Sequence, residues 1–282
     1  MSTFSTCTSS TRPSSPTDGD VLFETDTKNV IIWDGSNWRG YQNDGTSGWS
    51  GTNAYSMNFD GTDDRLSLGS VITPSATSGT ISAWIKTTSS AYQAIFSTAD
   101  NASGGTWGWM AVYNNKLRIT FREGGGTVKT ADGSTTINDG NWHHVMAVSS
   151  GIAYNLYVDG SAETLTNSNN DGTWYGDLTG LDSSDIASHV RTSSGNFFNG
   201  NIDELAVWDS DQSSNISTIY NSGTPGNLLS LSPSHWWRMG DGTEANSGTT
   251  VYDMSIGSVN ATVVNATSGT NTSGAVYQAD TP

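Results

Sequence analysis

The sequence has 282 residues, which is enough for one large domain and a small additional module. Glycine is frequent (32), proline is rare (6) and aromatic residues reach 10% of the chain, so many short strands joined by turns are expected and a disordered chain is not. The formal net charge of -16 argues against nucleic acid and anionic membrane surfaces as partners. Cys7 is the only cysteine, so no disulfide can form within the chain.

The first eight residues contain no positive charge and no apolar core, so we expect no signal peptide. No stretch of the sequence is long and apolar enough to span a bilayer, and membrane insertion is therefore not expected. These features predict synthesis and assembly in a cytoplasm.

The N-terminal part of the chain differs in composition from the rest. Residues 1–20 are rich in serine, threonine and proline and are expected to form an extended arm. Three strand-like runs follow at residues 21–25, 30–33 and 37–41, with turn residues between them. Such a β-meander is too small to be stable alone, so it needs the main domain, another copy of the chain or another protein as a neighbour. We therefore divide the chain into an attachment module at 1–45 and a main domain at 46–282.

The main domain is predicted to consist almost entirely of strands. The strand-like runs lie at residues 56–68, 80–86, 94–97, 108–113, 116–121, 142–148, 154–158, 200–208, 234–242 and 250–255. Within 142–148, alternate residues share one face of the strand, which we expect to face the core; they are Trp142, His144, Met146 and Val148. The runs at 234–242 and 250–255 either complete the sheets or start a second, truncated module; we expect completion, because too few residues remain for a second domain.

Several short motifs occur in a consistent order along residues 50–275. They are the FDG of 59–61, the WHHV of 142–145 with the LYVDG of 156–160, and the GNIDE of 200–204. Together they resemble laminin-G-like domains, which are concanavalin A-like lectin/glucanase folds. The resemblance implies an all-β, concanavalin A-like antiparallel β-sandwich (jelly roll) preceded by the small meander. Such domains usually bind ligands and seldom catalyse reactions.

The sequence lacks the carboxylate pattern of a glycoside hydrolase. Such enzymes place two carboxylates around one sugar, whereas Asp203 and Glu204 are adjacent on a strand and should point to opposite faces. No E-x-D-x-E run, G-x-S-x-G turn or zinc-type histidine spacing is present. We therefore predict a protein without catalytic residues.

Calcium is the cofactor that the sequence favours. Asp60, Asp63 and Asp64 cluster in one loop after a strand, and residues 167–172 form a second loop rich in oxygen-bearing side chains. Laminin-G-like relatives often hold Ca²⁺ in such loops, so we predict metal ligation by the three aspartates first. The alternative is that aspartate and asparagine act here only as turn formers.

Aromatic residues next to glycine-rich loops are the candidates for ligand binding. Exposed rings can stack on the apolar faces of sugars, and neighbouring amides can bind hydroxyl groups. The predicted ligand-binding residues are Trp107, Trp109, Trp174, Tyr175 and Asn101. The alternative, which the sequence leaves open, is that these rings close the end of the core.

Residues 12–45 resemble a short module of bacteriophage structural proteins, particularly those of marine phages. The resemblance implies a virion structural protein of the tail-fibre or capsid-decoration type, present as a homo-oligomer, attached to other virion proteins through 1–45 and displaying a glycan-binding sandwich for host attachment. An adhesive, carbohydrate-binding module of a bacterial surface protein is the alternative, and a polysaccharide hydrolase is the least favoured function.

Overall fold

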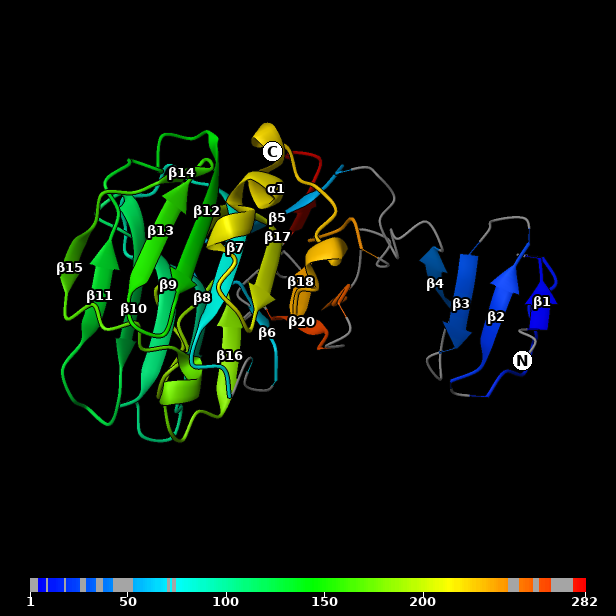
Figure 1. The fold of residues 1–282 in the computed structure, drawn as a ribbon, viewed down its shortest axis with the longest axis horizontal. Coiled ribbons are helices and arrows are strands. Elements are labelled where there is room, and N and C mark those ends of the chain that lie inside the picture. The colour runs from blue at the N-terminus through cyan, green and yellow to red at the C-terminus, as the bar shows by residue number, and fades with distance from the viewer. Residues whose placement is uncertain are drawn as a thin grey trace. The chain divides into compact units, whose positions relative to one another are not determined.

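The computed structural model describes residues 5–8, 10–17, 19–25, 29–33, 38–42, 53–69, 72, 75–242, 249–255, 259–264 and 276–282. The chain divides into two units, Met1–Thr52 with Asn227–Ser232 and Asn53–Gly226 with Pro233–Pro282. Figure 1 shows the order of their elements. Over the described ranges, no helix has the length and apolar character needed to cross a membrane.

The first unit contains one small sheet in the order β1-β2-β3-β4. Its strands are β1 (Ser5–Cys7), β2 (Val21–Glu24), β3 (Asn29–Trp33) and β4 (Trp38–Gln42). Strands β2 to β4 form the predicted antiparallel meander, in which Leu22 pairs with Ile31 and both side chains are buried. Part of the segment expected to be an extended arm instead pairs with β2 as the parallel strand β1. The unit also contains a short 3-10 helix, η4 (Leu229–Leu231).

The second unit is a sandwich of two antiparallel sheets, which confirms the predicted all-β fold. The nine-stranded sheet has the order β15-β11-β10-β9-β8-β16-β6-β20-β19. Its strands are β6 (Arg65–Ser67), β8 (Gln93–Ala99), β9 (Trp107–Tyr113), β10 (Lys116–Arg122), β11 (Lys129–Asp132), β15 (Thr166–Ser168), β16 (Ser183–Ile186), β19 (Thr250–Val251) and β20 (Ala261–Val264).

The eight-stranded sheet has the order β14-β13-β12-β7-β17-β5-β21, and β18 also pairs with β17. Its strands are β5 (Ser56–Asp60), β7 (Gly79–Lys86), β12 (Trp142–Ser149), β13 (Tyr154–Val158), β14 (Ser161–Ala162), β17 (Asn199–Trp208), β18 (His235–Trp237) and β21 (Val276–Gln278). Short helical segments connect the strands: η1 (Tyr175–Asp177), η2 (Ser213–Asn215), α1 (Ile216–Tyr220) and η3 (Asn221–Gly223).

The final strands complete both sheets, as the sequence predicts. Strand β18 pairs with β17, with Trp236 opposite Ala206. Trp237 then forms a bridge with Asp253, close to β19, and β19 pairs with β20, which pairs with β6 of the nine-stranded sheet. The C-terminal part of the chain therefore contributes to both layers of one sandwich.

The prediction that Trp142, His144, Met146 and Val148 face the core is wrong. The core between the sheets instead contains the alternate β12 residues Val145 and Ala147. Alternation shows which residues share a face, but not which face points inward. The other face of β12 is itself covered, because the Tyr220 ring of α1 lies 5.8 Å from the ring of His144. Full burial lowers the pKa of His144 to about 4, so its imidazole stays neutral.

A buried ion pair connects Glu204 of the central strand β17 to Arg238, the residue that follows β18. The register of β17 shifts between Asp203 and Ala206, and Glu204 adopts a positive φ of 49° within this irregularity. The Glu204 carboxylate accepts hydrogen bonds from Arg238 Nε (2.9 Å) and Trp236 Nε1 (2.6 Å). Burial raises the pKa of Glu204 to about 7, while the Arg238 charge opposes that shift.

Glu204→Ala is expected to destabilise the second unit strongly. The substitution removes the carboxylate that accepts from Arg238 and Trp236 but leaves the guanidinium in its buried position, a change that costs about 3–5 kcal/mol in other proteins. Denaturant unfolding followed by tryptophan fluorescence measures the loss. The control Asp209→Asn changes an exposed carboxylate and should alter the free energy of unfolding by about 0.5 kcal/mol or less. Equal effects of the two variants would contradict a stabilising role for the buried pair.

Candidate functional site

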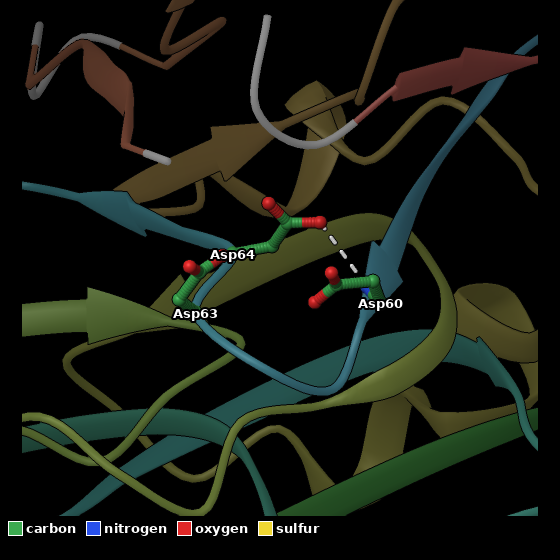
Figure 2. A group of neighbouring side chains, drawn as sticks. All are labelled: Asp60, Asp63 and Asp64. Atoms are coloured by element: carbon green, nitrogen blue, oxygen red, sulfur yellow. Dashed lines mark hydrogen bonds between the residues drawn. The ribbon is translucent and has the colours of Figure 1, made fainter. Parts of the chain in front are cut away.

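The loop between β5 and β6 brings the three predicted metal ligands together (Figure 2). The Asp60 backbone N–H donates to Asp64 Oδ2 (3.1 Å), and the Thr62 N–H donates to Asp60 Oδ1 (2.7 Å). Gly61 has a φ of 78°, and a Cβ there would lie 2.7 Å from Cβ of Asn199. The tight turn and this close approach therefore both require glycine.

One carboxylate oxygen from each of Asp60, Asp63 and Asp64 lies within 4.8 Å of the others. Asp64 is only 7% exposed, and burial raises its pKa, as do the charges of Asp60 and Asp63. A cation between these carboxylates would relieve their repulsion. Because calcium takes 6–8 oxygen ligands, the three carboxylates could supply part of a coordination shell that water or a ligand completes.

The second oxygen-rich loop uses its side chains for internal contacts. Asp171 Oδ2 lies 2.6 Å from Lys129 Nζ, and Asp171 Oδ1 accepts from Thr173. Asn170 Oδ1 accepts the Tyr154 backbone N–H (2.6 Å). These contacts favour a structural role for the loop at 167–172.

A row of aromatic side chains crosses the outer face of the nine-stranded sheet. In β9, Met110 and Val112 point into the core, so Trp107, Trp109 and Tyr113 project from the opposite face. Tyr92 completes the row beside β9. The ring centroids are separated by 4.8 Å (Trp107 to Trp109), 5.5 Å (Trp109 to Tyr92) and 4.9 Å (Tyr92 to Tyr113). We call these four residues the aromatic row.

A guanidinium group lies at each end of the aromatic row. The Arg118 guanidinium carbon is 3.5 Å from the centroid of the Tyr113 ring, and Asp132 holds this arginine by two hydrogen bonds of 2.6 and 2.7 Å. At the other end, the Arg191 guanidinium lies 5.7 Å from the centroid of the Trp107 ring. The row thus combines stacking surfaces with hydrogen-bond donors.

The aromatic row has an open half and a covered half. Tyr92 and Tyr113 are only partly buried, whereas Trp107 and Trp109 are 7% and 4% exposed. The imidazole of His189 stacks on Trp109, with 4.7 Å between the ring centroids and 21° between the ring planes. The indole N–H groups of both tryptophans are buried, and neither has a hydrogen-bond partner among the described residues. Buried donors without an acceptor are rare in folded proteins.

Trp174 and Tyr175 do not join this row. Both are fully buried in the core, with centroid distances of 5.5 and 5.1 Å to the ring of Phe121. Gly79 leaves room for Trp174, because a Cβ at Gly79 would lie 2.3 Å from the indole nitrogen. These two rings close the core and offer no face to a ligand, which is the alternative that the sequence left open.

Asn101 lies in the exposed loop between β8 and β9. Its backbone N–H donates to Asp182 Oδ1 (2.8 Å), so Asp182 holds the start of this loop. The same loop contains Gly104, whose carbonyl accepts two hydrogen bonds from Arg191. Asn101 is therefore on the loop at the covered end of the aromatic row.

Sequence reasoning missed Tyr92, Tyr113, Arg118, His189 and Arg191. Tyr113 could have been found, because alternate residues of a strand share one face, which places Tyr113 on the same face as Trp107 and Trp109. His189 and Arg191 lie some eighty residues further along the chain, and no local pattern connects them to β9.

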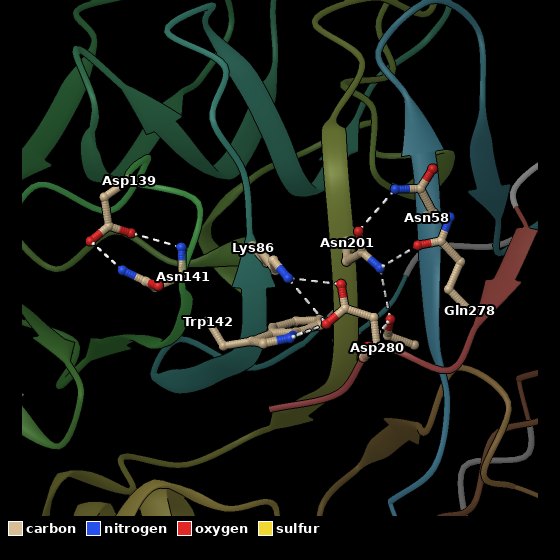
Figure 3. Close-up of polar contacts among 9 residues, drawn as sticks. Asn58, Lys86, Asp139, Asn141, Trp142, Asn201, Gln278 and Asp280 are labelled. Carbon is tan, nitrogen blue, oxygen red and sulfur yellow. Dashed lines mark hydrogen bonds and ion pairs between the residues drawn. The ribbon is translucent and has the colours of Figure 1, made fainter.

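The outer face of the eight-stranded sheet is occupied by the C-terminal segment (Figure 3). The Asp280 carboxylate accepts from Lys86 Nζ (2.8 Å) and from Trp142 Nε1 (3.0 Å), and its backbone carbonyl accepts from Ser56 Oγ (2.5 Å). Asn201 donates to Gln278 Oε1 (3.3 Å) beside these contacts. The polar groups of this face thus bind one another, and the aromatic row is the better candidate for a ligand site.

Residues 60–215 match the family described as the concanavalin A-like lectin/glucanases superfamily. The match spans more than half of the chain, so the protein belongs to this family and its second unit is a lectin-like domain. The fold that the sequence resemblance implied is therefore confirmed. No curated protein shows a significant match to the sequence.

The chain aligns with several solved structures. A protein from Bacteroides ovatus named "putative carbohydrate binding protein" aligns with a TM-score of 0.56 at 15% identity, covering 93% of this chain and 70% of that one. The CBM40 of the Ruminococcus gnavus IT-sialidase aligns at 0.47 and 18% identity, covering 56% of this chain and 96% of its own. A SAP-like pentraxin from Limulus polyphemus aligns at 0.45 and 19% identity, covering 60% and 82%.

Addition of calcium is expected to raise the melting temperature of the protein, and Asp64→Asn should reduce this shift by more than half. The buried Asp64 carboxylate contributes charge that its amide lacks. Because the pKa of Asp64 is raised, calcium affinity should fall with decreasing pH sooner than for an ordinary aspartate. Scanning calorimetry measures the shift in melting temperature, and calorimetric titration at several pH values measures the calcium affinity. The exposed Asp209→Asn is the control. A calcium response that is identical in Asp64→Asn and the wild type would exclude this loop as the metal site.

Proposed function

We propose that the second unit is a non-enzymatic lectin-like module that binds glycans over the open half of the aromatic row. The observation that carries this proposal is the row itself, with Tyr92 and Tyr113 partly exposed between Arg118 and the covered tryptophans. Aromatic faces stack on sugar rings, and a guanidinium group donates to hydroxyl or carboxylate oxygens. Membership of a family that includes lectins supports the same function.

The position of the carboxylates supports binding rather than hydrolysis. Asp203 and Glu204 are both buried, and their hydrogen bonds go to the protein's own groups, including Asn53 and Arg238. Burial raises the pKa of Asp203 well above its usual range. On the aromatic row, Asp132 is occupied by Arg118. Glycoside hydrolysis requires two carboxylates that reach one glycosidic bond, and neither arrangement provides such a pair.

Tyr113→Ala should weaken glycan binding by about tenfold, because it removes one stacking ring and the aromatic face on which the Arg118 guanidinium lies. The full chain is screened on a glycan array, and the dissociation constant of the strongest ligand is then measured by calorimetry. Tyr157→Ala is the matched control, since Tyr157 is a partly buried tyrosine on β13 of the other sheet. The proposal is refuted if no glycan binds, or if Tyr113→Ala and Tyr157→Ala bind equally well.

We further propose that this lectin-like domain is displayed on a phage particle, as a tail-fibre or capsid-decoration protein attached through residues 1–45. The resemblance of residues 12–45 to a module of phage structural proteins supports this role. Display in many copies would convert a weak single-site glycan contact into strong attachment. An adhesive module of a bacterial surface protein remains the alternative use of the same domain.

Mass spectrometry of particles purified from the phage that encodes this sequence should detect the chain at a stoichiometry of many copies per particle. Deletion of residues 1–45 should abolish incorporation while leaving glycan binding by the second unit intact. Recovery of the full chain only in the host envelope fraction would refute a virion role and favour the surface adhesin.

A further inference from the structure

We propose that His189 occupies a saccharide position on Trp109, and that residues 189–195 form a lid which a saccharide displaces. With the lid moved, the binding surface would extend from Tyr92 and Tyr113 to Trp109 and Trp107. This inference rests on the proposed glycan binding and specifies how the covered half of the aromatic row takes part in it.

Two buried indole N–H groups lie under the lid. Trp107 and Trp109 are more than nine-tenths buried, and their Nε1 atoms have no hydrogen-bond partner among the described residues. A buried donor that lacks an acceptor is unfavourable, and native proteins keep few of them. Saccharide hydroxyl groups are acceptors as well as donors, so a sugar over this surface would satisfy groups that the closed lid leaves unpaired.

The position of His189 is the position that a ring ligand would take. Its imidazole lies nearly parallel to the indole of Trp109, at a centroid distance of 4.7 Å. Stacking of this kind requires only a flat or apolar face, which the C–H side of a pyranose also offers. A saccharide ring could therefore replace the imidazole with little change in the sheet below.

The lid is a small loop that is closed by its own backbone. The N–H of His189 donates to the carbonyl of Gly195 (2.9 Å), and the Gly195 N–H donates to the carbonyl of His189 (3.1 Å). Ala187 and Asn196, on either side of this bridge, have positive φ values of 67° and 47°. Because the bridge lies within the loop, residues 189–195 can move together without losing it.

Few polar contacts hold the lid against the sheet. The Val190 N–H donates to Ser97 Oγ (3.1 Å), and Arg191 donates twice to the carbonyl of Gly104 (3.0 and 3.2 Å). Arg191 has no carboxylate within ion-pair distance among the described residues. Its guanidinium could therefore exchange one carbonyl oxygen for an oxygen of the saccharide while staying beside Trp107.

A first experiment tests the lid without any ligand. Hydrogen exchange of the tryptophan indole N–H groups is followed by NMR in the full chain, with Trp174 as the internal control. The Trp174 Nε1 atom is likewise buried and has no hydrogen-bond partner among the described residues, but it lies in the core and should exchange only on global unfolding. We expect Trp107 and Trp109 to exchange at least about tenfold faster than Trp174. Equal protection of the three indoles would overturn the lid.

A second experiment uses two substitutions at one position. His189→Ala removes the imidazole from Trp109 and should tighten binding of the strongest array glycan by about threefold to tenfold. His189→Phe keeps a ring on Trp109 and should give no gain, and melting temperatures show whether both variants remain folded. Tighter binding by both variants, or weaker binding by His189→Ala, would overturn the proposal that His189 stands in for a saccharide.

The two proposals fail in different ways. If wild type binds a glycan and Tyr113→Ala loses it, while His189→Ala gives no gain, glycan binding stands and the saccharide position on Trp109 is refuted. If the wild type and His189→Ala both bind no glycan, the proposed function fails, even where the exchange data show a lid that opens.

Discussion

The sandwich depends on the buried pairing of Glu204 with Arg238. Glu204 belongs to β17, the strand that joins β7 to β5 in the eight-stranded sheet, and Arg238 directly follows β18. Two buried charges are tolerated only when they satisfy each other, so the pair specifies one register for β18 on β17. The bridge from Trp237 to Asp253 then leads to β19 and β20. Strand β20 lies beside β6, which follows the loop that contains Asp63 and Asp64. The segment from β18 to β20 thus contributes to both layers, and the ion pair stabilises its first strand on β17.

The two outer faces of the sandwich differ in how they are covered. On the eight-stranded sheet, Tyr220 covers Trp84 and His144, and Asp280 binds Lys86 and Trp142. That face is therefore covered by ring contacts and by hydrogen bonds to Asp280. The nine-stranded sheet is covered only in part, and its cover leaves two indole donors without acceptors. A ligand gains more from the second face, because binding there supplies acceptors to buried indole donors in exchange for the few polar contacts of the lid.

The sequence predicts the strands well and their surroundings poorly. Alternation correctly groups Trp142 with His144 and Trp107 with Trp109, because a strand has a period of two whatever packs against it. It cannot say which face turns inward, since that depends on whether a distant segment such as α1 or the lid covers the other side. Trp174 follows a glycine-rich turn much as Trp107 does, yet it enters the core because Gly79, nearly a hundred residues earlier, leaves space for it. Asp60, Asp63 and Asp64 come together as expected, because they lie within five consecutive residues at the end of β5 and in the loop that follows.

Several basic side chains lie on the face of the aromatic row, although the net charge of the chain is negative. Leu117, Ile119 and Phe121 point into the core, so the basic residues of β10 project onto the same outer face as the row; they are Lys116, Arg118 and Arg122. Arg191 adds a further cation at the covered end. Salt screens charges beyond about 8–10 Å. A ligand on this face therefore interacts more strongly with these nearby cations than with the other charges of the chain, whose formal net charge is -16. The acidic composition therefore does not exclude acidic sugars, because these four of the chain's 11 lysine and arginine residues lie on the face where such a sugar would bind.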